Sequence, residues 1–215
     1  MLISEETEKL VLNEATDYGN EIIPFDMSLG RILAETIKAG DTNILPGSRI
    51  TPLIISLLVT IGELEVRVKR LPKVVIISYN SRLNGVNNNS QQQLKLPQSY
   101  LLQAALKQQG IDSAVLAVAD DADAANNLVQ QCIHSFDAIL FTADAGNLLH
   151  PVLSQASIAE VAHHSTGPQL TASFWLGKHQ GGTLLFAFQC DAGKTLSYVD
   201  QYFIPWLNTS LKADI

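Results

Sequence analysis

The stretch Lys73-Val-Val-Ile-Ile-Ser-Tyr-Asn-Ser-Arg-Leu83 joins a continuous apolar run to a polar loop. The unbroken run from Val74 to Ser78 is typical of a strand covered on both faces, as in a parallel sheet flanked by helices. The loop after such a strand lies at the carboxyl end of the sheet, where open α/β proteins bind ligands. We therefore expect Tyr79-Asn80-Ser81-Arg82 to occupy the position of an active-site loop, although it holds no glycine, acid or nucleophile arrangement.

The order strand, loop, helix repeats after this stretch and predicts an α/β domain over residues 71–215. The alternation favours a three-layer arrangement in which helices cover both faces of a parallel or mixed sheet. The segment 158–164 fits a strand and a helix almost equally, and we interpret it as a short strand. The predicted strands are 74–78, 113–118, 138–141, 158–164, 170–175 and 184–188, and helices begin near Pro97, Asp121 and Lys194.

Residues 1–70 have a different rhythm and predict a small N-terminal α+β unit. Ser4 precedes two acids, as the N-cap of a helix does, and Gly19 ends that segment. The other predicted elements are a short strand at 21–25, a second short helix at 28–35, a turn-rich connector at 41–48, a helix from about Pro52 to Thr60 and a strand at 64–68.

Composition narrows the class of protein. The chain has 215 residues, of which 47% are apolar and 16% charged, and its net charge is −7. The negative charge argues against binding a nucleic-acid polymer, because phosphate contacts need clustered Lys and Arg. No apolar run is long enough to cross a bilayer, so we expect no membrane span. The acidic start, Met1-Leu-Ile-Ser-Glu-Glu, differs from the basic start of a signal peptide and favours a cytoplasmic location.

Most of the reactive side chains have ordinary structural interpretations. Cys132 and Cys190 lack Cys-x-x-Cys spacing and are expected to be buried thiols. His163 and His164 are adjacent on a predicted strand, so they point to opposite faces and would not converge on one metal ion. Asp120-Asp121 precedes a predicted helix, which favours capping over a catalytic pair.

Three loops lie at the predicted carboxyl ends of strands: 79–82, 143–147 and 189–193. Each contains at most one glycine, whereas an anion site at a helix N-terminus uses adjacent glycines to free backbone N–H groups. Asp144 and Asp191 would repel an anion unless a metal lay between them. These acids could hold Mg²⁺ against a substrate, although turn and N-cap positions are the commoner role for Asp.

The order of the pieces resembles the molybdopterin molybdenumtransferase (MoeA) family, whose central domain is shared with MogA-like molybdopterin adenylyltransferases. Leu29-Gly-Arg-Ile-Leu-Ala34 is similar to the family's Leu-Gly-Arg-(Ile/Val)-Leu-Ala run, and Leu45-Pro-Gly-Ser-Arg-Ile-Thr-Pro52 resembles the segment that returns to its first domain. Lys73 to Leu83 stands where the family has a strand ending Ser-Thr-Gly-Asp-Glu-Leu. Phe136 to Thr142 stands where a strand precedes Gly-Gly-Val-Ser-Val-Gly-Asp. The resemblance covers nearly the whole chain and implies a molybdopterin-binding fold.

The sequence departs from the family at the motifs that carry chemistry. Ser78 and Leu83 match the first motif, but residues 79–82 replace its Thr, Gly, Asp and Glu. Gln98 replaces the Asn of an Asp-Ser-Asn motif, while the run from Ser99 continues in register. Thr142 matches the next motif, and residues 143–145 displace its Gly-Gly-Val; residues 188–192 replace Leu-Pro-Gly-Asn-Pro. The family's inserted domain and C-terminal β domain have no counterpart in this sequence.

The resemblance implies molybdopterin or an adenylylated form of it as ligand, molybdate as a second substrate, Mg²⁺ as cofactor, and a homodimer that the apolar N-terminal unit would suit. Catalytic residues cannot be assigned by matching motifs. The candidate ligand-binding residues are Ser78, Asn80, Arg82, Gln98, Ser99, Thr142, Asp144, Asn147 and Asp191, with Asp144 and Asp191 as candidate metal ligands.

Three hypotheses about function remain open. The first is a catalytically degenerate MoeA-like binding or partner subunit, because Ser81 cannot supply a carboxylate to a metal or a base. The second is an active transferase with a rebuilt site that uses Asn80, Arg82, Asp144 and Asp191. The third is an unrelated role on a shared fold. Saturable binding of a pterin or a nucleotide would separate a working site from an eroded one.

Overall fold

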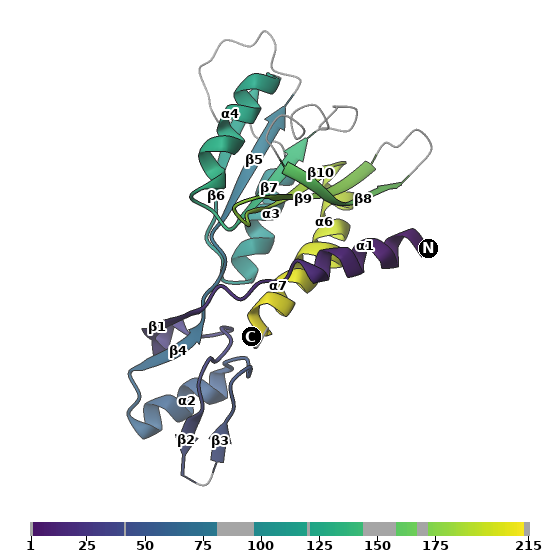
Figure 1. The fold of residues 1–215 in the computed structure, drawn as a ribbon. Coiled ribbons are helices and arrows are strands. Elements are labelled where there is room, and N and C mark those ends of the chain that lie inside the picture. Colours follow the sequence, from purple (N-terminus) through teal and green to yellow (C-terminus); the bar gives the residue numbers. More distant parts are fainter. Residues whose placement is uncertain are drawn as a thin grey trace. The chain divides into compact units, whose positions relative to one another are not determined.

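A computed structural model describes residues 2–40, 42–80, 97–119, 121–143, 158–166 and 172–212 (Figure 1). Its contacts divide the chain into two compact units. The α/β unit comprises Met1–Glu14 and Pro72–Trp206, and the small unit comprises Ala15–Leu71 and Leu207–Ile215. Within the described ranges, no helix has the length and apolar character needed to cross a membrane.

The described part of the α/β unit contains a six-stranded sheet with the order β6-β5-β7-β10-β9-β8. The strands β6, β5, β7 and β10 are parallel, whereas β9 runs antiparallel to both of its neighbours. The predicted parallel or mixed sheet is therefore confirmed. The strands are β5 (Val74–Asn80), β6 (Ala114–Ala119), β7 (Ala138–Ala143), β8 (Ile158–Thr166), β9 (Ala172–His179) and β10 (Leu184–Gln189).

The apolar run that predicted the fold forms β5, an inner strand next to the edge strand β6. It lies between β6 and β7, and Ser78 is in register with Ala117 on one side and Thr142 on the other. Val75, Ile76 and Ile77 are fully buried. Because successive side chains of a strand point to opposite faces, this continuous burial requires cover on both faces of the sheet.

Helices supply that cover and make three layers (Figure 1). The helix α4 (Ala122–Ile133) packs its Val129 and Ile133 against the face that carries Val75 and Ile139. The helix α3 (Pro97–Gln108) lies on the opposite face, where Ser99 meets Ser78. Asp121 caps α4 by accepting hydrogen bonds from the N–H groups of the first turn, at 3.0 Å, so the capping interpretation is confirmed.

The C-terminal helix is interrupted. We expected one helix from about Lys194, but α6 (Ala192–Tyr198) and α7 (Ile204–Lys212) are joined by a π-helical turn at Val199–Phe203. The ring of Tyr202 in this turn stacks on Phe174 of β9, with centroids 4.3 Å apart. The predicted inward-facing aromatic residues Tyr202, Phe203 and Trp206 are buried.

The small unit is an α+β structure, as predicted. The strands β1 (Asn20–Pro24) and β4 (Glu65–Lys69) pair antiparallel, and β2 (Ile37–Ala39) pairs with β3 (Thr42–Ile44). A short 3₁₀ turn, Phe25–Met27, follows β1. The helix α2 (Pro52–Ile61) is capped by Thr51 and ends at Gly62, which has φ of +80°. The core of the small unit contains Leu33, Ile37, Ile50, Leu58, Val66 and Val68.

The helix predicted at 28–35 is wrong. Ile32 and Leu33 instead form isolated β-bridges with Arg49 and Val68. The backbone N–H of Gly30 donates to the carbonyl of Ile50, and that of Leu33 to the carbonyl of Ser48. These distant partners replace the i−4 carbonyls that a helix would use, and they bury Leu33 completely. The connector at 41–48 also holds a strand, and Ser4 lies inside α1 (Leu2–Asn13), where it cannot be the N-cap.

The contacts divide the chain differently from a single boundary at residue 70. The division falls between Leu71 and Pro72, but residues 1–14 group with the α/β unit. There Val11 of α1 is fully buried, and Glu14 forms an ion pair of 2.6 Å with Lys178 of β9. Residues 207–215 group with the small unit, in which the side chain of Asn208 accepts a hydrogen bond from Arg49 at 3.2 Å.

Candidate functional site

Buried polar side chains gather on one face of the sheet near the carboxyl ends of β5 and β7. We call Ser78, Gln98, Ser99 and Thr142 the polar cluster. Ser78, Ser99 and Thr142 are completely buried and Gln98 is 6% exposed. Ser99 Oγ donates to Ser78 Oγ at 3.3 Å, and Thr142 Oγ1 donates to the carbonyl of Ile77 at 3.4 Å. The structure therefore brings together these four residues of the predicted site.

The periodicity of the elements explains this convergence. Ser78 and Thr142 occupy equivalent positions on adjacent parallel strands, so both side chains lie on the same face of the sheet. Gln98 and Ser99 lie in the first turn of α3, which begins at Pro97. The layer between the sheet and α3 is otherwise apolar, with Ile76 from β5 and Leu102 and Leu106 from α3, so the cluster is a polar area within a hydrophobic layer.

Gln98 is the member whose bonding is incomplete. Its Nε2 donates to the backbone carbonyl of Cys190, at 2.8 Å, which fixes the identity of the two amide atoms. Its Oε1 is buried and has no hydrogen-bond partner among the residues that the structure describes. Burying an acceptor without a donor costs about 1–3 kcal/mol. An N–H or O–H group placed beside this oxygen would remove that cost.

Asp191 has a structural role. Its carboxylate accepts from the backbone N–H of Lys194, at 2.9 Å, and thereby caps α6. The commoner of the two roles that the sequence left open is thus the one observed. Among the described residues, no group of three or more His, Cys, Asp or Glu side chains could hold a metal ion. Asp144, the other candidate ligand, lies outside the described residues, so the Mg²⁺ pair stays a prediction.

The described structure does not place the side chains of the other predicted residues. Arg82, Asp144 and Asn147 lie outside the described residues. Asn80 is the last residue of β5, where its backbone is in register with Ala119, and its side chain is outside the description. The rebuilt site predicted from Asn80, Arg82, Asp144 and Asp191 therefore stays a prediction.

Cys190 and Thr195 are neighbours of the cluster that the sequence did not single out as site residues. Cys190 Sγ lies 3.3 Å from Thr195 Oγ1, and both residues are fully buried. Burial raises the pKa of the Cys190 thiol to about 11, and it also raises the pKa of Cys132. Both thiols are therefore protonated near neutral pH, and the prediction of buried, unpaired cysteines is confirmed.

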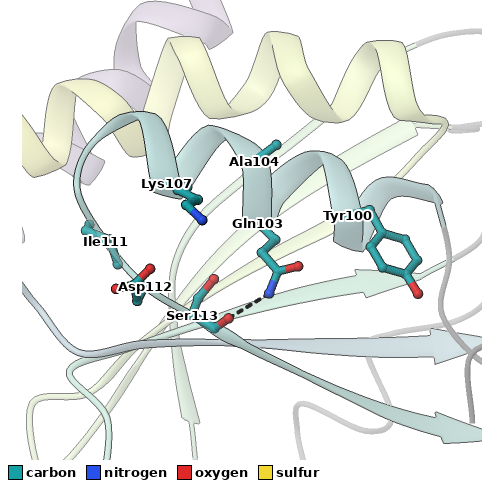
Figure 2. Close-up of a pocket in the computed structure, with 7 residues that line it drawn as sticks. All are labelled: Tyr100, Gln103, Ala104, Lys107, Ile111, Asp112 and Ser113. Carbon is teal, nitrogen blue, oxygen red and sulfur yellow. Dashed lines mark hydrogen bonds between the residues drawn. The ribbon is translucent and has the colours of Figure 1, made fainter.

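A surface groove of about 410 Å³ lies on another part of α3 (Figure 2). Gln103 spans it, donating from Nε2 to the carbonyl of Ser113 at 2.8 Å. No motif in the sequence indicated this groove, because its residues meet only where the chain leaves α3 and turns back towards β6. The lining residues are Tyr100, Gln103, Ala104, Lys107, Ile111, Asp112 and Ser113.

The sequence matches no family model and no curated protein. Solved structures do resemble the fold. The molybdopterin biosynthesis MoeA protein of Pyrococcus horikoshii superposes with a TM-score of 0.77 at 15% identity, over 98% of this chain and 80% of that chain. A molybdenum cofactor biosynthesis protein of Pyrococcus furiosus gives a TM-score of 0.64 at 22% identity, over 99% and 72% of the two chains.

These matches span the whole α/β unit and the small unit, as the resemblance in sequence predicted. The superpositions show a common fold, while at identities of 15–22% function must be argued from the site. The chain therefore has the fold of the MoeA molybdopterin biosynthesis proteins.

Proposed function

We propose that this chain is a MoeA-like protein of molybdenum cofactor biosynthesis that binds a molybdopterin-type ligand without transferase chemistry of its own, as a binding or partner subunit. The observation that carries the proposal is the polar cluster, which lies near the carboxyl ends of β5 and β7 in a sheet that otherwise buries apolar side chains. That edge is where open α/β sheets bind ligands. A cytoplasmic location is part of the same proposal.

The chemistry of Gln98 supports a pterin-type ligand. The buried Oε1 accepts no hydrogen bond from any described residue, so a ligand that completes the cluster would bring a donor. Pterins carry amino and ring N–H donors of this kind. The hydroxyls of Ser78, Ser99 and Thr142 can both donate and accept, so they can adapt to either kind of ligand atom.

The proposal contains no metal-dependent step. Transfer of molybdenum would need carboxylates that could hold Mg²⁺ beside the ligand, and Asp191 is already committed to the N-terminus of α6. Molybdate is therefore treated as a possible ligand in the test below and has no assigned binding residues.

Calorimetric titration of the purified chain tests the proposal. The ligands are molybdopterin, its adenylylated form and AMP, each with and without Mg²⁺ and molybdate. We expect saturable, micromolar binding of molybdopterin that Gln98→Leu weakens by about tenfold, since about 1.4 kcal/mol corresponds to a factor of ten. Gln108→Leu changes an exposed glutamine of the same helix and should bind like the unmodified chain.

Two results would contradict the proposal in different ways. A folded sample that binds none of the ligands has no pterin site. Release of AMP from adenylylated molybdopterin, lost in Asp144→Ala, would instead establish the alternative, an active molybdopterin molybdenumtransferase with a rebuilt site.

We also propose that the chain forms a homodimer through the small unit. This unit exposes many large apolar side chains, although its own core is small: Ile22, Met27, Leu29, Leu45, Leu53, Val59, Ile61 and Leu64. Such exposure is typical of an association surface. Sedimentation equilibrium should show that Leu53→Glu with Leu64→Glu weakens the dimer, and an unchanged mass would contradict this role.

A further inference from the structure

The groove of Figure 2 has the size of a small-molecule site. Its volume of about 410 Å³ lies within the range of about 300–1,000 Å³ that is usual for ligand pockets. One wall is α3 and the other is the turn before β6. Tyr100 and Lys107 are two helical turns apart on α3, which is about 10 Å at the rise of an α-helix. Figure 2 shows Lys107 and Asp112 towards one end, Tyr100 at the other, and Gln103 and Ser113 between them.

Two opposite charges line one end of this groove without neutralising each other. The side chains of Lys107 and Asp112 are exposed, and neither forms an ion pair or a hydrogen bond with any residue in the part of the chain that the structure describes. A ligand of one charge would pair with one of these groups and meet the other as a like charge. A ligand that carries both charges on adjacent atoms would pair with both. The charged end therefore matches a zwitterion.

The middle of the groove holds polar atoms whose bonding is incomplete. Gln103 Nε2 donates to the carbonyl of Ser113 at 2.8 Å, which fixes the orientation of the amide and leaves Oε1 as the acceptor. Ser113 Oγ is buried and has no hydrogen-bond partner among the described residues. Gln103 and Lys107 line the same groove, and their long side chains can turn to let a ligand atom reach this hydroxyl. An ammonium group, which has three N–H donors, can bond to a carboxylate and to these two oxygens.

Tyr100 gives the far end of the groove an aromatic wall. It is 46% exposed, so a ring of a ligand can pack against it in an offset or edge-to-face arrangement. Ala104 and Ile111 add aliphatic contacts along the groove. The span of about 10 Å between the charged end and Tyr100 fits a small zwitterion whose planar side chain extends away from its charged groups.

We propose that this groove binds a free amino acid with an aromatic side chain, with its carboxylate at Lys107, its ammonium group at Asp112 and its ring towards Tyr100. The site is separate from the polar cluster, whose Gln98 bonds to the carbonyl of Cys190. The groove and the polar cluster use different residues of α3, and the proposal does not rest on a pterin ligand.

Titration of the full chain with L-phenylalanine, followed through the amide chemical shifts, tests the proposal. We expect saturable shifts centred on residues 100–113, with a dissociation constant of about 1 mM or below, as is reasonable for a ligand of this size. Three further probes each lack one group: hydrocinnamate has no ammonium group, phenethylamine has no carboxylate and L-alanine has no ring. Each should bind at least about tenfold more weakly than L-phenylalanine. Binding of hydrocinnamate or phenethylamine as tight as that of L-phenylalanine would overturn the assignment of a zwitterion.

Substitution of the two charged residues shows which group of the ligand each one binds. Asp112→Asn should weaken L-phenylalanine by about tenfold and leave hydrocinnamate unchanged, because hydrocinnamate has no ammonium group. Lys107→Gln should weaken L-phenylalanine and leave phenethylamine unchanged, because phenethylamine has no carboxylate. Asp123→Asn and Lys9→Gln are the matched controls, since both replace exposed charges outside the groove, and they should bind like the unmodified chain.

Two results would overturn the proposal. One is a folded chain that shows no saturable shifts with L-phenylalanine up to about 10 mM. The other is saturable binding that neither Asp112→Asn nor Lys107→Gln weakens, which would place the ligand elsewhere. Gln98→Leu should leave the binding of L-phenylalanine unchanged, so failure of this site is distinguishable from failure of the pterin site.

Discussion

The two halves of the sheet are built from different side chains. In the half that contains β5 and β7, most buried side chains are aliphatic, such as Val75, Ile77 and Ile139, although Tyr79 and Phe141 are also buried there. In the half that contains β9, the buried side chains include Phe174 and Trp175, and aromatic rings continue into the helices above the sheet. Phe174 stacks on Tyr202, and Phe186 of β10 lies 5.0 Å from the ring of Trp206.

This difference indicates that one half of the sheet contributes most of the stability and the other half carries the candidate ligand site. The rings of Phe203, in the π-helical turn, and of Trp206 pack against Phe186 of the sheet. The aliphatic half holds its helices with smaller side chains and accommodates the hydroxyls of Ser78 and Thr142 near its carboxyl end. We expect the aromatic half to supply more stability and the aliphatic half to supply the site.

Removing a ring should have the largest effect. Phe186 is fully buried against Phe203 and Trp206, so Phe186→Ala leaves a cavity and should lower the free energy of unfolding by about 3–5 kcal/mol. Ile76→Val, in the aliphatic half, should cost about 0.5–1.5 kcal/mol. Urea unfolding measures both variants. Equal losses would break the comparison between the two halves.

Gly177 should give the next largest effect, because the ring of Trp175 lies where its side chain would be. A Cβ added at Gly177 would meet the ring at 2.1 Å and Ile158 at 2.4 Å. Gly177→Ala should therefore destabilise by about 1–3 kcal/mol and change the fluorescence of Trp175. Gly193→Ala is a mild control, since its nearest contact would be an ordinary 3.4 Å. Native fluorescence and stability in Gly177→Ala would show that the ring can move at little cost.

Substitution in the polar cluster should cost less stability than either change. Ser99→Ala removes a donor to Ser78 and should lower the free energy of unfolding by about 0.5–1.5 kcal/mol. The same variant should weaken ligand binding, whereas Phe186→Ala should not weaken binding while the protein stays folded. Urea unfolding and calorimetry on the same samples measure both effects. Unchanged binding in Ser99→Ala would separate the cluster from the ligand.

The smallest effect should be a dependence of the free energy of unfolding on pH, which arises from a residue in the aromatic half. His164 of β8 contacts the rings of Tyr198 and Tyr202, and burial lowers its pKa, with smaller contributions from Lys194 and His163. His164 binds a proton less well in the folded state than in the unfolded state. The free energy of unfolding is therefore unaffected by His164 above about pH 6.5 and falls as the pH drops below that value. Unfolding at pH 7.5 and 5.5 should show the loss, and His164→Gln should remove it. A loss of equal size in His164→Gln would assign it to other groups.

The sequence predicted helices and strands correctly where the hydrophobic period of a single element continued without interruption. The apolar run of β5, the amphipathic α3 and the capped α4 were all predicted, and each is determined by residues close together in the chain. It failed at 28–35, where Gly30 and the backbone partners Ser48 and Ile50 override a local helical pattern. The π-helical turn was also missed, because its residues have the same spacing as an ordinary helix.

For the site, the resemblance to the MoeA family indicated Ser78, Gln98, Ser99 and Thr142, which stand at or beside the positions of its motifs. It could not show that Gln98 binds the carbonyl of Cys190 and leaves Oε1 without a donor, because those residues are 92 positions apart. Nor could it decide whether Asp191 was a cap or a metal ligand, since both roles use the same residue in the same kind of loop.

The sequence by itself determined the alternating layers of the α/β unit, because side-chain period and turn residues act over a few neighbouring positions. The tertiary structure alone decided which strand became a bare edge, which face received the rings and which polar groups met. Those outcomes depend on contacts between distant segments, as when α1 packs against β8 and leaves β6 as the open edge of the described sheet. Such contacts arise only when the whole chain buries its apolar surface together.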